Sequence, residues 1–279
     1  MDDLVSIEWL AAHLHDDGLV IVDASMAPPG SSQPLPDEGI PGAVRFDLGG
    51  AMSRQDDADG LGPVGVHDML APADFERELR ALGIRAGDRL VAYDAAGIFS
   101  SARAWWMLRA AGIDAAVLDG GLPGWIEAGQ PLVPVAGSTG REGDVEVRWD
   151  ASALVGADVT AAALDSGDVA VLDARSASRF SGAEPDPRET VRAGHMPGAV
   201  SLHYGALAPG GRMLPPAALR ERIQAAAGDR AVIASCGSGV TAAVIALAAT
   251  LVDRDVCVYD GSWSQWGHRD SGRPVVTEG

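Results

Sequence analysis

The sequence predicts an α/β fold built from two successive copies of one domain, each with a mostly parallel sheet flanked by helices. Three observations support this prediction. The chain has 279 residues, which is long enough for about two domains. Blocks of sequence from the first half recur in the second half. Short apolar runs alternate with helical patterns, as in βαβ units.

The internal repeat is the strongest of these observations. Three blocks of the first half return in the second half in the same order, and an ordered set of matches indicates duplication. The pairs are Ile21-Val22-Asp23-Ala24-Ser25 with Val171-Leu172-Asp173-Ala174-Arg175, Gly39-Ile40-Pro41-Gly42-Ala43-Val44 with His195-Met196-Pro197-Gly198-Ala199-Val200, and Leu118-Asp119-Gly120-Gly121 with Tyr259-Asp260-Gly261-Ser262. A turn-rich stretch separates the halves, so we expect domains at 1–136 and 153–279 joined by a linker at 137–152.

Each half contains two clear strand–helix pairs. In the first half we expect strands at 19–22 and 90–93, a helix from Pro72 that Gly83 closes, and a second helix at 101–111. In the second half we expect strands at 169–172 and 231–235, with helices at 216–227 and 240–251. Ligands of such sheets bind beyond the carboxyl ends of the strands, so functional residues are sought there.

Composition and charge exclude several classes of protein. The formal net charge of −18, with no lysine in the chain, disfavours binding to nucleic acid or to an anionic membrane. No apolar run is long enough to span a membrane, and the acidic start does not resemble a signal peptide. Two cysteines form no disulfide framework. We therefore expect a cytoplasmic protein. No metal-ligand spacing and no phosphate-loop or dinucleotide pattern is present, so we expect no metal or cofactor, and we expect a monomer.

Cys236 is the residue most suited to covalent chemistry. It follows the apolar strand at 231–235, and Gly237-Ser238-Gly239 leads from it into the next helix. Glycines allow the backbone to curl so that several N–H groups face one centre. Together with the helix dipole, these donors favour an anion such as a thiolate or a persulfide. A buried structural cysteine is the ordinary alternative, and the glycines argue against it.

The other cysteine and the first half provide contrasts. Cys257 lies in the strand Val256-Cys257-Val258-Tyr259, where we expect an inert core thiol that does not pair with Cys236. In the first half, the strand at 90–93 ends in Asp94 where the second half has its cysteine. An aspartate cannot carry sulfur, so we expect the first copy to be catalytically inactive.

The loop Cys236-Gly237-Ser238-Gly239-Val240-Thr241 resembles the active loop of the rhodanese-type sulfurtransferases, in the form found in 3-mercaptopyruvate sulfurtransferases. Other blocks match the family in order over nearly the whole chain: Arg103-Ala104-Trp105-Trp106, Asp119-Gly120-Gly121, His195-Met196-Pro197-Gly198 and Asp260-Gly261-Ser262-Trp263. The resemblance implies two tandem rhodanese-like domains with one active site, and no cofactor.

The resemblance also implies roles for individual residues. Cys236, Ser238 and His67 match the catalytic residues, although Gly49 stands where the family has the acid of the Ser-His relay, leaving Asp47, Asp68 or no acid in that role. Arg179 and Arg188 match the arginines that hold the substrate; their sequence alone would also allow a surface salt bridge with Glu184 or Asp186. Gly237, Gly239, Val240 and Thr241 complete the implied substrate-binding loop.

The implied reaction moves a sulfane sulfur from 3-mercaptopyruvate to thioredoxin, another small thiol or cyanide, and releases pyruvate. Three alternatives remain at this point. Thiosulfate is a second possible donor, although thiosulfate-specific relatives place basic residues just after the cysteine, where this chain has Gly237 and Ser238. A non-catalytic rhodanese-like module usually lacks the cysteine. A related phosphatase needs an arginine at the position of Ala242.

Overall fold

The computed structural model describes residues 1–27, 34–54 and 67–277. The chain forms two compact units. Unit 1 comprises Met1–Ser53, Met69–Ala151 and Pro209–Met213, and unit 2 comprises Arg54–Asp68, Ser152–Ala208 and Leu214–Gly279. The two units are described separately below.

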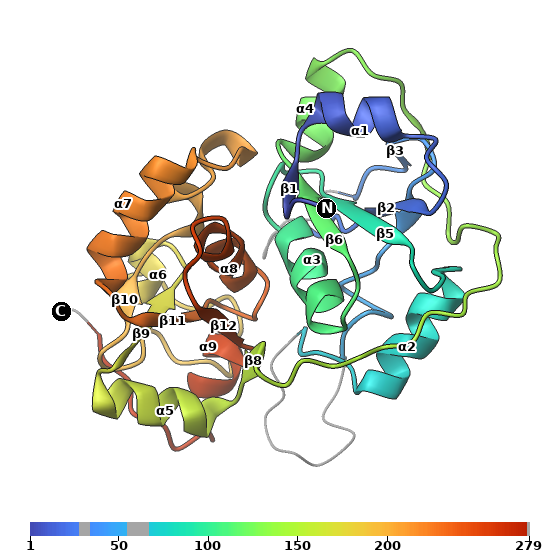
Figure 1. Ribbon diagram of the computed structural model, residues 1–279. Helices are drawn as coiled ribbons and strands as arrows, with labels where there is room; N and C mark the ends of the chain where they lie inside the picture. Colours follow the sequence, from blue (N-terminus) through green and yellow to red (C-terminus); the bar gives the residue numbers. More distant parts are fainter. Residues whose placement is uncertain (28–33, 55–66, 278–279) are drawn as a thin grey trace. The chain divides into compact units, whose positions relative to one another are not determined.

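Unit 1 is a five-stranded parallel sheet with helices on both faces (Figure 1). The strand order is β1-β6-β5-β2-β4, and a small antiparallel pair, β3-β7, lies outside the sheet. Its elements are β1 (Leu4–Val5), α1 (Ile7–His13), β2 (Leu19–Asp23), β3 (Glu38–Gly39), β4 (Val44–Arg45), α2 (Pro72–Ala81), β5 (Arg89–Tyr93), α3 (Ser101–Ala110), β6 (Ala115–Leu118), α4 (Gly121–Glu127) and β7 (Val133–Pro134).

Unit 2 repeats this design. Its parallel sheet has the order β10-β9-β11-β12-β8, which is the order of unit 1 read from the other edge. The elements are β8 (Leu154–Val155), α5 (Ala157–Ser166), β9 (Val169–Asp173), α6 (Ala177–Ser181), β10 (Val200–Ser201), η1 (Tyr204–Ala206), α7 (Pro216–Ala227), β11 (Ala231–Ser235), α8 (Ala242–Thr250), β12 (Val256–Tyr259) and α9 (Ser262–Trp266); the short turn η2 (Pro209–Gly211) belongs to unit 1. The predicted fold class is confirmed.

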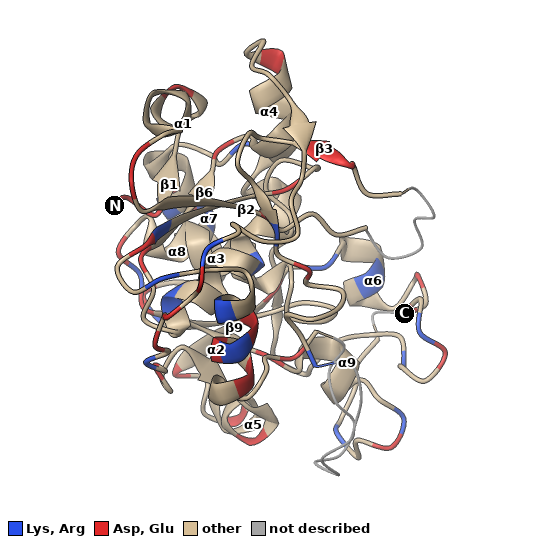
Figure 2. Cartoon of the chain, turned by 90° about the vertical axis from the view of Figure 1, so that its right-hand side faces the viewer, with Lys and Arg blue, Asp and Glu red and all other residues tan. Residues whose placement is uncertain are grey.

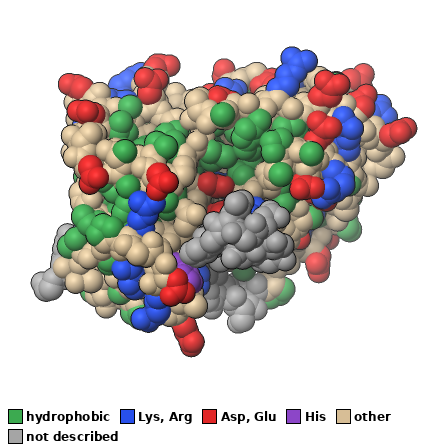
Figure 3. All heavy atoms as spheres, turned by 90° about the horizontal axis from the view of Figure 1, so that it is seen from below, with side chains coloured by type: hydrophobic (Ala, Val, Ile, Leu, Met, Phe, Trp, Pro, Cys, Tyr) green, Lys and Arg blue, Asp and Glu red, His purple; other side chains and the backbone are tan. Residues whose placement is uncertain are grey.

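The core of each unit lies between the sheet and its helices. In unit 1, α1 and α4 cover one face through Leu10 and Trp125, both fully buried. In unit 2, α5 and α9 cover the matching face, where Trp263 and Trp266 pack. Few large apolar side chains of the described residues are exposed, and the face in Figure 3 shows apolar patches among charged side chains. Basic residues are interspersed with acidic ones along the chain (Figure 2).

The central elements follow the predicted positions closely. β11 and α7 have the predicted bounds, and Gly228 follows α7 at its carboxyl end with a φ of 62°. α8 begins at Ala242 instead of Val240. Gly239 has a φ of 79°, a left-handed conformation that suits glycine, and the chain turns there before the helix can start.

The stretch predicted as a linker runs along unit 1 for most of its length. Thr139 N–H donates to the carbonyl of Leu82, and Asp150 N–H donates to the carbonyl of Ala110. The domain limits proposed from sequence stay a prediction. The compact units are not continuous in sequence, because Pro209–Met213 groups with unit 1 and Arg54–Asp68 groups with unit 2. Among the described residues, no helix combines the length and apolarity that crossing a membrane requires.

Candidate active site

Cys236 lies at the carboxyl end of the central strand of unit 2. β11 is flanked by β9 and β12, and its residues Val232–Ser235 are buried. The chain then turns through residues 236–241 into α8, in which every residue from Ala242 to Ala249 is buried. Cys236 itself is 2% exposed. The sulfur is therefore held at the amino end of a helix that is anchored on all sides.

The first turn of α9 fixes the backbone of the cysteine loop. Ser262 Oγ accepts the N–H of Cys236 at 3.2 Å, and Trp263 N–H donates to the carbonyl of Cys236 at 2.9 Å. Ser264 N–H donates to the carbonyl of Gly237 at 2.8 Å. Ser262 adopts a φ of 46°, which non-glycine residues seldom do. The repeated block at 259–262 marks this turn in the sequence, but the pattern does not indicate that Ser262 bonds to the cysteine loop.

The loop presents a series of backbone donors. Within the described part of the chain, the N–H groups of residues 237–242 have no hydrogen-bond acceptor. Buried N–H groups are normally paired, so a run of free donors beside a cysteine indicates a site for an anion. A persulfide on Cys236 is such an anion.

In unit 1, the loop that corresponds to the cysteine loop binds a carboxylate from its own sequence. Asp94 takes the place of Cys236: its carbonyl accepts the N–H of Leu122, as that of Cys236 accepts the N–H of Trp263. The Asp94 carboxylate accepts four backbone N–H groups, from Ala96, Phe99, Ser100 and Ser101, at 2.8–2.9 Å. Burial raises the pKa of Asp94, and the bonds from the loop act in the opposite direction. The backbone donors of the loop in unit 1 are therefore already paired with the Asp94 carboxylate.

Two arginines lie against the cysteine loop. A Cβ placed on Gly237 would lie 3.4 Å from Arg179 Nη2 and 3.5 Å from Arg188 Nη2. Arg188 also donates to the carbonyl of Gly237 at 3.1 Å. Arg179 comes from α6, and Arg188 from the loop that follows. Both guanidinium groups therefore lie within van der Waals distance of a Cβ at position 237, directly after the cysteine.

A buried carboxylate joins the two arginines. Asp186 Oδ2 accepts from Arg179 at 2.6 Å and from Arg188 at 3.0 Å, and Asp186 Oδ1 accepts from Arg188 Nε at 2.8 Å. The side chain of Asp186 is 1% exposed. Burial alone raises its pKa, but the hydrogen bonds and charge of Arg188, with the charge of Arg179, lower the pKa below the usual aspartate value. Glu184 instead accepts from Ser178, so the salt bridge considered from sequence forms with Asp186.

The structure describes Ser238 and His67, the two residues proposed for the relay, but it does not test a contact between them. Ser238 is half-buried beside Cys236, and its hydroxyl makes no hydrogen bond within the described part of the chain. His67 and Asp68 group with unit 2, which holds Cys236, whereas Asp47 groups with unit 1. His67 has a φ of 76° and is half-buried. The roles of Ser238 and His67 stay predictions.

Cys257 has a different environment from Cys236. It lies on β12, where it pairs with Ile233 of β11, and it packs against the core of unit 2. Burial raises the pKa of its thiol to about 11, so only about one molecule in a thousand carries the thiolate at pH 8. Both cysteines are free. A thiolate nucleophile is therefore not expected at this position.

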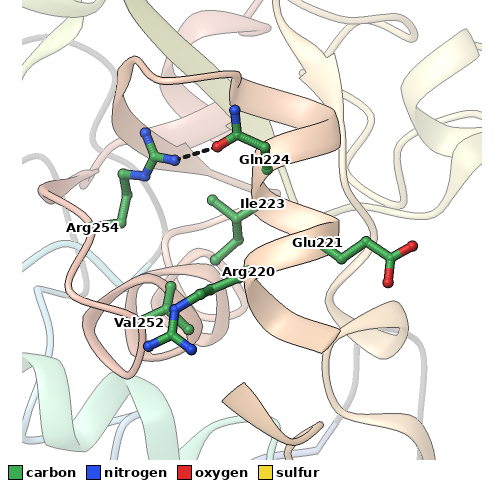
Figure 4. A pocket seen from close by; sticks show the side chains of 6 residues that line it. All are labelled: Arg220, Glu221, Ile223, Gln224, Val252 and Arg254. Carbon is green, nitrogen blue, oxygen red and sulfur yellow. Dashed lines mark hydrogen bonds between the residues drawn. The ribbon is translucent and has the colours of Figure 1, made fainter. Parts of the chain in front are cut away.

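Other hollows of unit 2 lie away from the cysteine loop. A pocket of about 340 Å³ (Figure 4) is formed by α7 and the segment that follows α8, at the opposite end of that helix from Cys236. Its lining residues are Arg220, Glu221, Ile223, Gln224, Val252 and Arg254. It contains no nucleophile. In the described residues, no group of three or more His, Cys, Asp or Glu side chains is arranged to hold a metal ion.

Comparison with known proteins identifies the family of this chain. The model of the rhodanese-like domain matches residues 6–128 and again residues 157–269. This chain belongs to the tandem rhodanese-domain sulfurtransferases. It is 36% identical over 280 residues to a 3-mercaptopyruvate sulfurtransferase of Escherichia coli strain K12, covering 95% of each chain.

Two further members of the family extend the comparison. A crystal structure of SseA from Escherichia coli, described as a 3-mercaptopyruvate sulfotransferase, superposes with a TM-score of 0.82 at 34% identity, covering 94% of this chain and 99% of the other. A mitochondrial protein of Arabidopsis thaliana named for both thiosulfate and 3-mercaptopyruvate is 31% identical, over 95% of this chain and 76% of its own length. The family predicted from the sequence is confirmed.

Proposed function

We propose that this protein is a 3-mercaptopyruvate sulfurtransferase that uses Cys236 as its nucleophile. The observation that carries the proposal is the pair of guanidinium groups, from Arg179 and Arg188, next to the residue that follows the cysteine. A thiol nucleophile beside two arginines suits a donor that joins a carboxylate to a transferable sulfur. The relatives named for this donor support the same substrate.

The proposed reaction has two steps. The Cys236 thiolate attacks the sulfur of 3-mercaptopyruvate, the carbon–sulfur bond breaks, and its electron pair stays on carbon as the enolate of pyruvate. The proton of the substrate thiol moves to that carbon, which yields pyruvate and a Cys236 persulfide anion. An acceptor thiol, such as that of thioredoxin, then attacks the outer sulfur and carries it away, which restores the Cys236 thiolate.

The chain's own residues support each step. The free N–H groups of residues 237–242 suit the negative charge of the persulfide. Arg179 and Arg188 orient the carboxylate and keto oxygen of the donor. Ser238, two residues from the nucleophile, relays the proton with His67. Two free cysteines fit a reducing, cytoplasmic location.

The donor is tested by measuring kcat/KM for 3-mercaptopyruvate and for thiosulfate with the same acceptor. We expect 3-mercaptopyruvate to be the better donor. Ser238→Ala should lower turnover with 3-mercaptopyruvate by about a hundredfold, because proton transfer to the enolate is slowed, and should change turnover with thiosulfate by less than about threefold, because sulfite leaves without a proton.

The matched control is Ser201→Ala, which removes an exposed hydroxyl from β10 of the same unit. It should leave both rates unchanged. A higher kcat/KM for thiosulfate in the native protein would replace the proposal with a thiosulfate sulfurtransferase. An equal loss with both donors in Ser238→Ala would contradict the role of the hydroxyl as a proton relay.

A further inference from the structure

Asp186 lies between the two arginines beside the cysteine loop, whereas its neighbour Glu184 bonds to Ser178. Its carboxylate accepts from both guanidinium groups and also from the backbone N–H of Arg188 at 3.1 Å. Its side chain is 1% exposed, whereas those of Arg179 and Arg188 are 18% and 25% exposed. The carboxylate is thus covered while the arginines remain accessible.

The contacts of Asp186 leave part of each arginine free. The Asp186 carboxylate accepts hydrogen bonds from Nη2 of Arg179 and from Nε and Nη2 of Arg188. Within the described residues, Nη1 of each arginine has no acceptor, and Arg179 Nε is buried without one. Donors remain for a ligand on both guanidinium groups, and their orientation is set by the carboxylate they share.

The two prolines that flank Asp186 restrict the backbone that carries its carboxylate. Asp186 stands between Pro185 and Pro187. A proline restricts both its own backbone and that of the residue before it, so the chain around Asp186 has few alternative conformations. Two guanidinium groups and one carboxylate leave a single net positive charge in this cluster.

We infer that Asp186 is a positioning residue that also sets donor specificity, by reducing the charge of the arginine pair to match one carboxylate. This inference rests on the proposed function. A monoanionic 2-oxo acid is matched by one positive charge, whereas a dianion such as thiosulfate gains from two. Selectivity for 3-mercaptopyruvate thus comes from a negative group in the anion site as well as from the absence of basic residues at positions 237 and 238.

The test replaces Asp186 by asparagine, which keeps the shape and removes the charge. In Asp186→Asn, KM for 3-mercaptopyruvate should rise at least about tenfold with kcat changed less than about threefold, because the arginines lose their common anchor. The ratio of kcat/KM for thiosulfate to that for 3-mercaptopyruvate should rise at least about tenfold, or about 1.4 kcal/mol.

Two other variants separate charge from structure. Asp186→Glu keeps the charge, so it should keep the native donor ratio within about threefold even if KM rises, and it decides the question if Asp186→Asn does not fold. Glu184→Gln removes an equal charge from an exposed side chain of the same loop that bonds only to Ser178 among the residues described, and it should behave as the native protein.

A binding measurement makes the test independent of turnover. In Cys236→Ser protein, isothermal titration calorimetry with pyruvate and with sulfate compares a monoanion with a dianion. Adding Asp186→Asn should weaken pyruvate binding relative to sulfate binding. An unchanged donor ratio together with an unchanged pyruvate-to-sulfate ratio would overturn the inference, as would a shift of the donor ratio in Asp186→Glu equal to that in Asp186→Asn. Failure of the native protein to use 3-mercaptopyruvate would instead refute the proposed function.

Discussion

Cys236→Ser is expected to lower sulfur release from 3-mercaptopyruvate by at least about a thousandfold. A serine hydroxyl is a far weaker nucleophile toward sulfur and cannot form a persulfide, so no residual pathway through this residue remains. The side chain is 2% exposed and of nearly equal size in both forms, and the fold should persist. Pyruvate production under saturating donor and thiol acceptor is the measurement, with circular dichroism as the check on folding.

Cys257→Ser is the matched control for this substitution. It makes the same change on β12, one strand away, at a thiol whose raised pKa of about 11 keeps it protonated. Its activity should stay within about twofold of the native value. If both variants lost activity to the same extent, the assignment of the nucleophile to Cys236 would be wrong.

Asp94→Ala is expected to destabilise unit 1 by about 3 kcal/mol or more. The substitution removes the acceptor of four backbone N–H groups in a side chain that is 1% exposed, and it leaves those donors buried without partners. The cost of burying the carboxylate, which raises its pKa, offsets part of this loss. The destabilisation comes from the four N–H donors, which the alanine variant leaves buried without an acceptor.

Hydrogen exchange followed by mass spectrometry measures the loss of stability in each unit separately, through the exchange rates of its backbone amides. In Asp94→Ala, amides of α3 should exchange faster, while those of α8 should keep their native rates. Asp94→Asn should also destabilise, because its amide nitrogen would face N–H donors. Asp16→Ala, which removes a surface partner of Arg89 at 3.5 Å, should change stability by less than about 0.5 kcal/mol. Native exchange in α3 of Asp94→Ala would show that the carboxylate does not hold this loop.

The central strands and their helices were predictable because their signals are local. β11 is a run of small and β-branched residues bounded by Arg230 and Cys236, and α7 begins after Pro215 and ends before Gly228. The two-residue edge strands such as β1 and β10 were not predicted. Two residues cannot show a period of alternation, and these strands exist only because longer neighbours pair with them.

The candidate site was predictable in its residue types but not in its internal contacts. The position of Cys236 follows from the strand, loop and helix order around it. The part played by Asp186 does not, because its sequence is equally compatible with a solvent-exposed salt bridge. Only the folded loop shows that Asp186 is buried and that Glu184 turns to Ser178. Similarly, the hydroxyl of Ser262 reaches Cys236 through a turn 26 residues further along the chain.

The central claim is that sulfur passes through a persulfide on Cys236. Mass spectrometry of protein treated with 3-mercaptopyruvate in the absence of an acceptor tests it most directly. We predict one added sulfur atom, confined to the peptide that contains Cys236, with one pyruvate released per protein molecule, and loss of that sulfur when a thiol is added. Turnover without added sulfur on Cys236, or added sulfur on Cys257, would contradict the account.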